Sequence, residues 1–340
     1  MSSSEALRWG ILGAGKIAND FIIALKTLPA EEHHVVAIGA SSCDKAQSLC
    51  RQHGVKKAYG SYKEVVSDPE VQVVYVSTIH PTHKELCLLA LEHGKHVLCE
   101  KPMTLNLKDA KEVMQTARDK NLFFMEALWT RFFPLVDEVK NMIGSKEIGD
   151  VKVVMASFGF ASLANIPRLI EKELGGGVLL DIGIYCLNMA DIFFGGEKPQ
   201  HISACGHKTS DDGVDYAITV TLLYSGNRMA QILASADTDL PNECIVCGSN
   251  GSVKICAPFW SSEKIIKSDG SEKEFPLPKP YAPMNFFNST GMRYEIQAVR
   301  KSILSGKTQS EVMPHSTTER IMGWMDEIRR QIGVTYKEDN

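Results

Sequence analysis

The chain has 340 residues, more than one hydrophobic core usually organises, so two domains are expected. Its 44% hydrophobic and 23% charged residues are typical of a globular protein, and its net charge of -4 argues against a nucleic-acid partner, since such proteins usually carry a basic excess. The sequence has neither an uninterrupted apolar run of the ~20 residues that span a bilayer nor a recognisable secretory signal, so we expect no membrane partner.

Short apolar runs alternate with amphipathic helical segments through the first ~125 residues. The predicted strands are LRWGIL (7–12), HVVAIGA (34–40), VQVVYVS (71–77), HVLCE (96–100) and LFFMEA (122–127). The predicted helices between them are Asn19–Lys26, Lys45–His53, His83–His93 and Leu107–Asp119. Apolar strands that alternate with helices predict a doubly wound parallel sheet of the Rossmann type, an α/β fold.

The stretch GILGAGKIA (10–18) ends the first strand and opens the first helix. Gly13 permits a tight turn, Gly15 lets a pyrophosphate approach the backbone, and Ala18 takes the third small position. A glycine triplet alone is weak evidence, but strand, turn and helix here have the required order. The stretch therefore predicts a dinucleotide site at the helix N-terminus rather than a purely structural turn.

The second strand ends without the acidic residue that usually accepts a hydrogen bond from the ribose of NAD. Ser41 and Ser42 stand there instead, followed by Lys45, and Asp44 could cap the next helix. Small hydroxyls and a cation suit a 2′-phosphate, so NADP is predicted. The alternative is a serine-rich helix cap that selects neither cofactor.

The predicted strand 71–77 leads into STIHPTHK (77–84), where His80 and His83 are three residues apart. A metal pair is disfavoured, because Pro81 intervenes and no carboxylate clusters nearby. We expect these residues to flank the nicotinamide ribose at the carboxyl end of the strand. A histidine that merely starts a helix is the remaining possibility.

After Trp129 strand-like runs with short connections predominate, which predicts an α+β domain with a large, open and mostly antiparallel sheet. The predicted strands are VKVVMASFGF (151–160), HISACGH (201–207), YAITVTLLY (216–224), RMAQILASA (228–236) and ECIVCG (243–248), and the predicted helices are Phe133–Ile143, Arg293–Leu304 and Ser316–Ile332. We predict a cofactor domain over residues 1–128 and a substrate and dimerisation domain over 129–340. The proline-containing piece Ser268–Ser289 is expected to be an ordered surface excursion.

Both alternating sets of side chains in VKVVMASFGF are largely apolar, and YAITVTLLY shows the same pattern more mildly. A sheet with one solvated face should instead alternate clearly between polar and apolar side chains. The chain's own helices can cover one face, whereas a second apolar face needs a partner. We therefore predict an isologous homodimer.

Nine cysteines, an odd number, are scattered along the chain and define no disulfide framework. Most lie in apolar runs, as free thiols do in a reducing compartment. Cys244 and Cys247 form a CxxC pair in a strand-like run without a second pair, so structural cysteines are favoured over a zinc or redox site. A cytoplasmic protein without a metal is expected.

A lysine directly after a buried strand, as in CEKPMT (99–104), is either solvated surface or part of a reaction site. Together with GxGxxA, TxHPTH and GGGVLLDIGIY (175–185), this EKP tripeptide resembles the glucose–fructose oxidoreductase (Gfo/Idh/MocA) family over essentially the whole chain. The resemblance implies that Lys101 is catalytic. It also implies that Pro102 holds the turn, often after a cis peptide bond.

The runs LRWGI (7–11), AYGSYKE (58–64), MEALWTRFFP (125–134) and LLDIGIYC (179–186) resemble one subfamily more closely. That resemblance implies an NADP-dependent dimer that oxidises trans-dihydrodiols of aromatic hydrocarbons, or D-xylose at C1. Tyr185 stands where most of the family has histidine, and Trp129 and Phe158 match the subfamily. One departure is Ser41, where enzymes of the subfamily carry arginine.

The predicted chemistry depends on Lys101 and Tyr185. A tyrosine has a reference pKa of ~10, and a neighbouring ammonium favours the phenolate. Tyr185 beside Lys101 could then take the proton of a substrate hydroxyl, while Asp181, one helical turn earlier, orients the lysine or holds a substrate hydroxyl. Trp129 and Phe158 would wall the substrate pocket, although core packing is the simpler role for either alone.

The predicted cofactor-binding residues are Gly13, Ala14, Gly15, Lys16, Ile17, Ser41, Ser42, Lys45, Thr78, His80, His83, Glu100, Lys101, Trp129 and Arg131. The predicted substrate-binding residues are Trp129, Phe158, Asp181 and Tyr185. The alternative hypothesis is a sensor or regulatory protein that binds the dinucleotide without catalysis. Such proteins tend to lose the lysine or its acid/base partner, and this chain has both.

Overall fold

The computed structural model describes residues 6–210 and 212–339 and divides into two compact units. The first unit contains the chain up to Thr104, Lys108–Trp129 and Leu277–His315, and the second contains Leu105–Leu107, Thr130–Pro276 and the chain from Ser316. The structure thus differs from the predicted division after residue 128. Residues 277–315 return to the first unit, where a late helix buries Ile296 and Val299.

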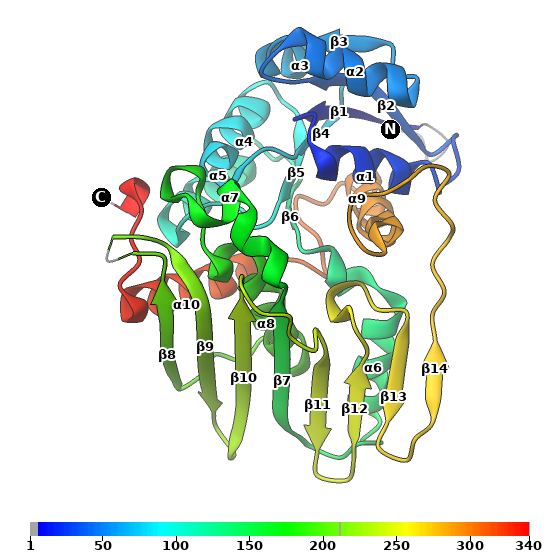
Figure 1. Cartoon of the computed structure of the whole chain (residues 1–340). Helices are drawn as coiled ribbons and strands as arrows, with labels where there is room; N and C mark the ends of the chain where they lie inside the picture. The colour runs from blue at the N-terminus through cyan, green and yellow to red at the C-terminus, as the bar shows by residue number, and fades with distance from the viewer. Residues whose placement is uncertain (1–5, 211, 340) are drawn as a thin grey trace. The chain divides into compact units, whose positions relative to one another are not determined.

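The first unit has a parallel sheet with the strand order β3-β2-β1-β4-β5-β6, which confirms the predicted doubly wound fold (Figure 1). Its strands are β1 Leu7–Leu12, β2 His33–Gly39, β3 Lys57–Tyr59, β4 Val73–Val76, β5 His96–Glu100 and β6 Phe124–Ala127. Its α-helices are α1 Lys16–Leu25, α2 Cys43–His53, α3 Tyr62–Ser67, α4 His83–Glu92, α5 Leu107–Asp119 and α9 Arg293–Leu304. The apolar runs become the central strands because helices cover both faces of a parallel sheet. The short β3 and α3 were not predicted.

The second unit has a sheet with the order β14-β13-β12-β11-β7-β10-β9-β8. Its strands are β7 Val151–Gly159, β8 His201–Lys208, β9 Asp215–Tyr224, β10 Arg228–Ser235, β11 Cys244–Gly248, β12 Ser252–Ile255, β13 Lys264–Lys267 and β14 Glu272–Glu274. Only β7 and β10 pair in parallel within the described residues; the other neighbours are antiparallel, as predicted. Strands β12, β13 and β14 were missed because each has only three or four residues.

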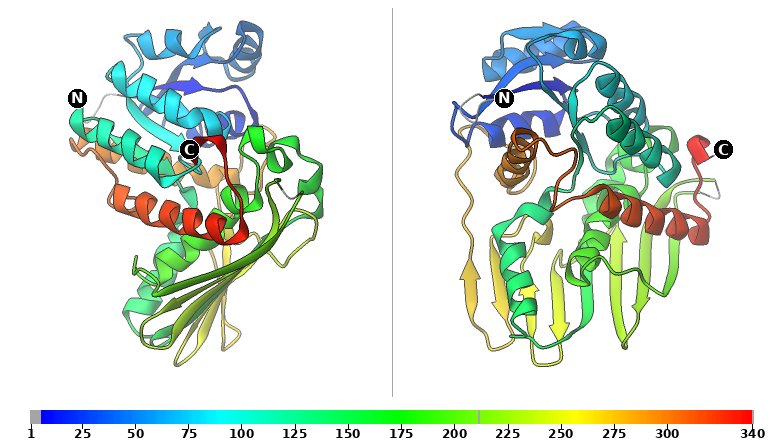
Figure 2. Two further views of the ribbon diagram at one scale, coloured as in Figure 1. Left: turned by 90° about the vertical axis from the view of Figure 1, so that its left-hand side faces the viewer. Right: turned by 180° about the vertical axis from the view of Figure 1, so that it is seen from behind.

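Three helices, α6 Pro134–Gly144, α8 Ile184–Phe193 and α10 His315–Ile332, cover one face of this sheet (Figures 1 and 2). In β7, Val154, Ala156 and Phe158 are buried, whereas Val153 and Met155 are only half-buried. The inner set is thus the one that meets the helices. The other apolar set of β7 belongs to the opposite, open face.

Within Lys172–Phe193, one 18-residue stretch is long and apolar enough to cross a membrane by length and composition. That stretch is fully buried inside the protein, as apolar core segments of globular proteins are. All nine cysteines are free thiols, and five of them are buried. Cys244 is buried in β11, so the CxxC pair belongs to the sheet.

Candidate functional site

The turn between β1 and α1 contains two glycines, and each position requires a small residue for a different structural reason. Gly13 has φ +118°, and a Cβ there would lie 2.8 Å from Ser77 Oγ and 2.9 Å from the Ser77 carbonyl oxygen. Gly15 has φ -90° at the N-cap of α1, and a Cβ there would have no neighbour within 4 Å. Gly13 therefore allows close packing of the protein, while Gly15 leaves open space before the helix N-terminus.

A cavity of about 390 Å³ opens beside this turn. Gly15, Lys16, Lys45, Gln52 and Asn285 are among the residues that line it. Two lysines and the positive end of a helix suit a phosphate-bearing ligand. The open space at Gly15 and this lining fit a dinucleotide, as the glycine motif predicted.

Asn285 reaches the cavity from a segment that the sequence analysis treated as a surface excursion. The buried carboxylate of Asp20 in α1 accepts hydrogen bonds from the backbone N–H groups of Asn285 and Phe286, each at 2.9 Å, and from Asn285 Nδ2 at 2.8 Å. These bonds hold the segment against α1. No local pattern could have revealed this, because the contact joins distant parts of the chain.

A second contact ties this segment to α2. His53 Nδ1 lies 2.7 Å from Tyr281 Oη, and its Nε2 lies 3.0 Å from Asn19 Oδ1. Burial and the charge of Lys26 lower the pKa of His53 to about 4. A neutral imidazole therefore donates to Asn19 and accepts from Tyr281.

The end of β2 places its serines at the start of α2. Ser42 is the N-cap of α2 without a side-chain capping bond, and Asp44, considered above as a cap, lies in the first turn. Ser41 and Lys45 are exposed. Lys45 lines the cavity beside the glycine turn, and the selection of NADP by Ser41, Ser42 and Lys45 stays a prediction.

His83 lies between the end of β4 and the turn after β5. Its Nδ1 is 2.9 Å from the Pro102 carbonyl oxygen and its Nε2 is 3.1 Å from that of Thr78. Burial lowers its pKa, which favours the neutral ring. A neutral ring has a single N–H, so His83 donates to one of these two carbonyls and lies between the two loops. Its predicted contact with the cofactor remains a prediction, as does that of the nearby His80.

Across residues 6–210 and 212–339, no group of three or more histidine, cysteine, aspartate or glutamate side chains lies close enough to hold a metal ion. The rings of His80 and His83 are 5.9 Å apart, centroid to centroid, and tilted by 62°. Their T-shaped contact packs one ring against the other.

Lys101 follows β5 and precedes a cis peptide bond to Pro102, in agreement with the family resemblance. The backbone N–H of Lys101 donates to Glu100 Oε2 at 3.3 Å, and the buried Glu100 carboxylate also accepts from the Tyr75 hydroxyl. The Met103 N–H donates to Glu126 Oε1 at 2.9 Å. Acidic side chains of β5 and β6 thus hold the turn that carries Lys101.

Asp181 and Tyr185 belong to the second unit. Asp181 lies in the π-helical turn Leu179–Gly183, which continues into α8 with Tyr185 in its first turn. The expected helix is therefore present, with a wider first turn of the kind often found at functional sites. Both side chains are largely buried.

Arg168, which the sequence analysis did not select, holds Asp181. It lies in α7 Pro167–Ile170, and its Nη1 and Nη2 donate to the two carboxylate oxygens at 2.7 and 3.3 Å. A two-pronged ion pair of this kind fixes the orientation of the carboxylate. Asp181 is therefore already held in one orientation by its own unit.

Aromatic rings surround Tyr185 within the second unit. Phe158 stacks on Trp260 with ring centroids 3.8 Å apart and an interplanar angle of 8°. Tyr185 lies 5.8 Å from Phe158 and 6.4 Å from Trp260 by the same measure. Phe158 thus lies beside Tyr185, and its predicted contact with the substrate stays a prediction. Trp260 was missed because it follows a turn in a region without a recognised motif.

Two further predicted residues have other surroundings. Trp129 is buried at the end of the first unit. Arg131 belongs to the second unit, where its Nη1 donates to Asn188 Oδ1 at 2.7 Å and to Asp191 Oδ2 at 3.0 Å. Arg131 thus has an ion-pairing partner in α8, which favours a structural role over its predicted contact with the cofactor.

Comparison with known proteins places the chain in a family. Residues 7–128 match an oxidoreductase family with an NAD-binding Rossmann fold, and residues 136–254 match the GFO/IDH/MocA C-terminal domain. The trans-1,2-dihydrobenzene-1,2-diol dehydrogenase of Danio rerio is 47% identical over 98% of this chain and 99% of its own length. The Homo sapiens protein of that name is 41% identical over the same shares.

Solved structures agree on the fold. KijD10, a 3-ketoreductase from Actinomadura kijaniata in complex with NADP and TDP-benzene, has a TM-score of 0.83 at 24% identity, over 98% of this chain and 99% of that one. An aldose-aldose oxidoreductase from Caulobacter crescentus has a TM-score of 0.81 at 22% identity, over 96% and 97%. With family matches to both halves and relatives above 40% identity over nearly the full length, the chain belongs to the Gfo/Idh/MocA oxidoreductase family.

Proposed function

We propose that the protein is an NADP-dependent dehydrogenase that oxidises trans-dihydrodiols of aromatic hydrocarbons, D-xylose at C1, or both. The observation that carries this proposal is the likeness to curated dihydrodiol dehydrogenases over nearly the whole chain, together with the presence of both Lys101 and Tyr185. The aromatic rings beside Tyr185 support it, because they can stack on an arene or on the C–H face of a sugar.

NADP is the cofactor we assign, with Gly15 and the N-terminus of α1 facing the pyrophosphate and Ser41, Ser42 and Lys45 facing the 2′-phosphate. The complex of KijD10 with NADP supports this choice. A bound nicotinamide would supply the acceptor for the hydride of the substrate carbon. The residues of the first unit bind and orient the cofactor for this reaction.

Tyr185 is the proposed proton acceptor for the substrate hydroxyl, and the positive charge of Lys101 favours its phenolate. Asp181, held by Arg168, would accept a hydrogen bond from a second substrate hydroxyl. Phe158 and Trp260 would exclude water from the reacting carbon.

The test begins with a panel of dihydrodiols and aldopentoses, including D-xylose, each assayed with NADP and with NAD. Nicotinamide absorbance measures turnover, and the substrates and cofactors are compared by kcat/KM. No turnover with any of them, together with measurable binding of the dinucleotide, would favour the alternative of a silent sensor.

The matched variants are Tyr185→Phe and Tyr216→Phe, each of which removes one hydroxyl from the second unit. Tyr185→Phe should lower kcat by roughly 10²–10⁴-fold while the Kd for NADP stays the same. Tyr216→Phe, in β9 outside the proposed site, should leave kcat unchanged. A normal kcat for Tyr185→Phe would leave Lys101 as the proton-transfer group.

The proposal includes a homodimer formed through the open face of the second unit's sheet. Leu223, Met229 and Leu233 on that face are 37%, 39% and 41% exposed. In register, Met229 lies between Val153 and Leu223, so the apolar side chains are neighbours. An apolar surface of this kind is best covered by a second copy of the same face.

Sedimentation equilibrium at micromolar protein should show twice the 37.5 kDa chain mass. Leu233→Glu should give the single chain, because it places a charge in the centre of the proposed interface. Gln115→Glu, a comparable charge on the exposed side of α5, should not change the mass. A monomeric unmodified protein would rule out the dimer.

The free thiols support the proposed cytoplasmic location.

A further inference from the structure

The glycine triplet Gly175–Gly177 lies directly before the π-helical turn that carries Asp181, and the protein encloses its last two members. The N–H of Gly176 donates to the Glu171 carbonyl at 3.0 Å, and that of Gly177 donates to the Leu169 carbonyl at 2.8 Å. A Cβ on Gly176 would lie 2.8 Å from the Glu171 oxygen. One side of the triplet is thus closed by its own preceding loop.

Two buried side chains close the other side. The Tyr336 hydroxyl donates to the Gly176 carbonyl, and Asp215 Oδ2 accepts from the Leu179 N–H at 2.6 Å. A Cβ on Gly177 would lie 2.5 Å from Asp215 Oδ1 and 3.0 Å from Tyr336 Oη. Tyr336 and Asp215 therefore hold the backbone where the π-helical turn begins.

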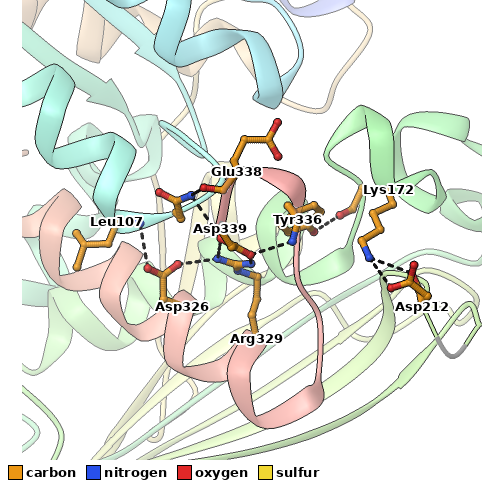
Figure 3. A network of polar contacts seen from close by, with 10 residues as sticks. Leu107, Lys172, Asp212, Asp326, Arg329, Tyr336, Glu338 and Asp339 are labelled. Carbon is orange, nitrogen blue, oxygen red and sulfur yellow. Dashed lines mark hydrogen bonds and ion pairs between the residues drawn. The ribbon is translucent and has the colours of Figure 1, made fainter.

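Tyr336 itself is held by an ion-pair network at the end of the chain (Figure 3). The buried Arg329 donates to Asp339 at 2.6 Å and to Asp326 at 2.9 Å, and its guanidinium lies 5.1 Å from the centre of the Tyr336 ring. The Tyr336 N–H donates to Asp339 Oδ2 at 2.8 Å. These contacts fix both the backbone and the ring of Tyr336.

The same network includes a loop from much earlier in the chain. Asn106 Nδ2 donates to the Glu338 carbonyl at 3.0 Å, and the Leu107 N–H donates to Asp326 Oδ2 at 3.0 Å. Charge-assisted bonds from the buried Arg329 to two partly exposed carboxylates support this end of the unit. The end of the chain is thus a built part of the second unit.

We infer that Tyr336 is a positioning residue, which fixes the start of the π-helical turn and thereby the directions of Asp181 and Tyr185. The inference rests on the proposed roles of those two residues. The Tyr336 hydroxyl donates to the backbone carbonyl of Gly176, five residues before Asp181. Its effect on turnover therefore passes through the orientation of the helix.

Tyr336→Phe tests this inference, because it removes the hydroxyl and keeps the ring that Arg329 contacts. We expect kcat to fall about tenfold or more, since small displacements of a reacting group have large effects on rate. The Kd for NADP should change less than twofold. Amide hydrogen exchange over residues 177–183 should accelerate.

The matched control is Tyr59→Phe. It also removes a hydroxyl that donates to a protein oxygen, Asp68 Oδ2 at 3.0 Å, but in the first unit. The two variants should lose similar thermal stability, and only Tyr336→Phe should lower kcat. A structural role alone would change the melting temperature of both variants and the kcat of neither.

Tyr185→Phe, measured beside them, separates this inference from the proposed function. If Tyr185→Phe is inactive and Tyr336→Phe has normal kcat and exchange, the positioning role is wrong and the proposed site is unaffected. If Tyr185→Phe is active, the proposed acid/base role is wrong. Reduced kcat with faster exchange in Tyr336→Phe would then still support positioning of this helix, and normal values would still overturn it.

Discussion

Two glycine-containing turns, one in each unit, precede the helices that matter most for the proposed function. Gly15 at the start of α1 has open space where a side chain would be, whereas Gly177 before the π-helical turn has Asp215 and Tyr336 there. Glycine thus has a different structural role in each of the two turns. Gly15 leaves space that a ligand can use, and Gly177 leaves space that the protein itself fills.

The difference has a physical cause. A ligand that approaches a helix N-terminus needs the backbone N–H groups to be accessible, so any Cβ there competes with the ligand. A positive φ and buried polar neighbours instead make Gly177 a packing requirement. Substitution at Gly15 should therefore affect binding, and substitution at Gly177 should affect folding.

The largest effect is expected for Gly177→Ala. Its φ of +124° and the 2.5 Å approach to Asp215 combine backbone strain with a steric clash. The free energy of unfolding should fall by roughly 3–4 kcal/mol in a urea titration. The control is Gly195→Ala, which has φ +64° but no neighbour within 4 Å and should lose only about 1–2 kcal/mol. Equal losses would show that the clash is unimportant.

A second prediction concerns the buried acid beside Gly177. Burial raises the pKa of Asp215 to about 6 from its ordinary value of 3.8. Because the folded state holds this proton more tightly, the contribution of Asp215 to stability is fully present below pH 3.8 and is lost as the pH rises through 6. The loss amounts to about 3 kcal/mol.

Asp215→Asn cannot ionise, so its stability relative to the unmodified protein should rise between pH 4 and 7, as followed by urea unfolding across that range. Two histidines of the first unit should have the opposite effect on the pH dependence of stability. Burial lowers the pKa of His33 and His53 to about 4, so their contributions are present above pH 6.5 and are lost as the pH falls toward 4. A parallel pH dependence for Asp215→Asn and the unmodified protein would contradict the Asp215 prediction.

Gly15→Ala should have the reverse signature of Gly177→Ala. Its φ of -90° suits alanine, and nothing clashes with the new Cβ, so the free energy of unfolding should stay within ~0.5 kcal/mol. The Kd for NADP, measured by fluorescence titration, should rise roughly tenfold or more, because the methyl group occupies the approach to the helix N-terminus. An unchanged Kd would remove the distinction between the two turns.

The smallest effect is expected at the end of β2. Ser41→Asp places a negative charge at an exposed position beside Lys45 and should weaken NADP relative to NAD by about tenfold. Parallel titrations with the two cofactors measure this ratio. Gln47→Asp, at an exposed position of α2 outside the cavity lining, is the control for charge alone. Equal Kd values for both cofactors in the unmodified protein would disprove the predicted preference.

The sequence alone was enough to predict the parallel fold of the first unit, the longer strands of the second sheet and the glycine turn before α1. Lys101 and Tyr185 were selected from the family resemblance, and their roles stay predictions. Periodicity reports burial directly, since a parallel strand covered on both faces must be continuously apolar. The glycine motif and the EKP turn are equally local, because each lies within a few residues of a strand end. Short strands such as β3 and β12 were not predicted, because three or four residues are too few to show an alternation of apolar and polar side chains.

Only the tertiary structure disclosed Asn285 beside the cofactor turn, Arg168 on Asp181, Trp260 against Phe158, and Tyr336 on the glycine triplet. Each of these contacts joins residues that are separated along the chain, and none leaves a repeated spacing in the sequence. The segment 277–315 likewise joins the first unit only when the chain folds back. Such partners are selected by hydrogen-bond geometry and packing in three dimensions, which a linear pattern does not encode.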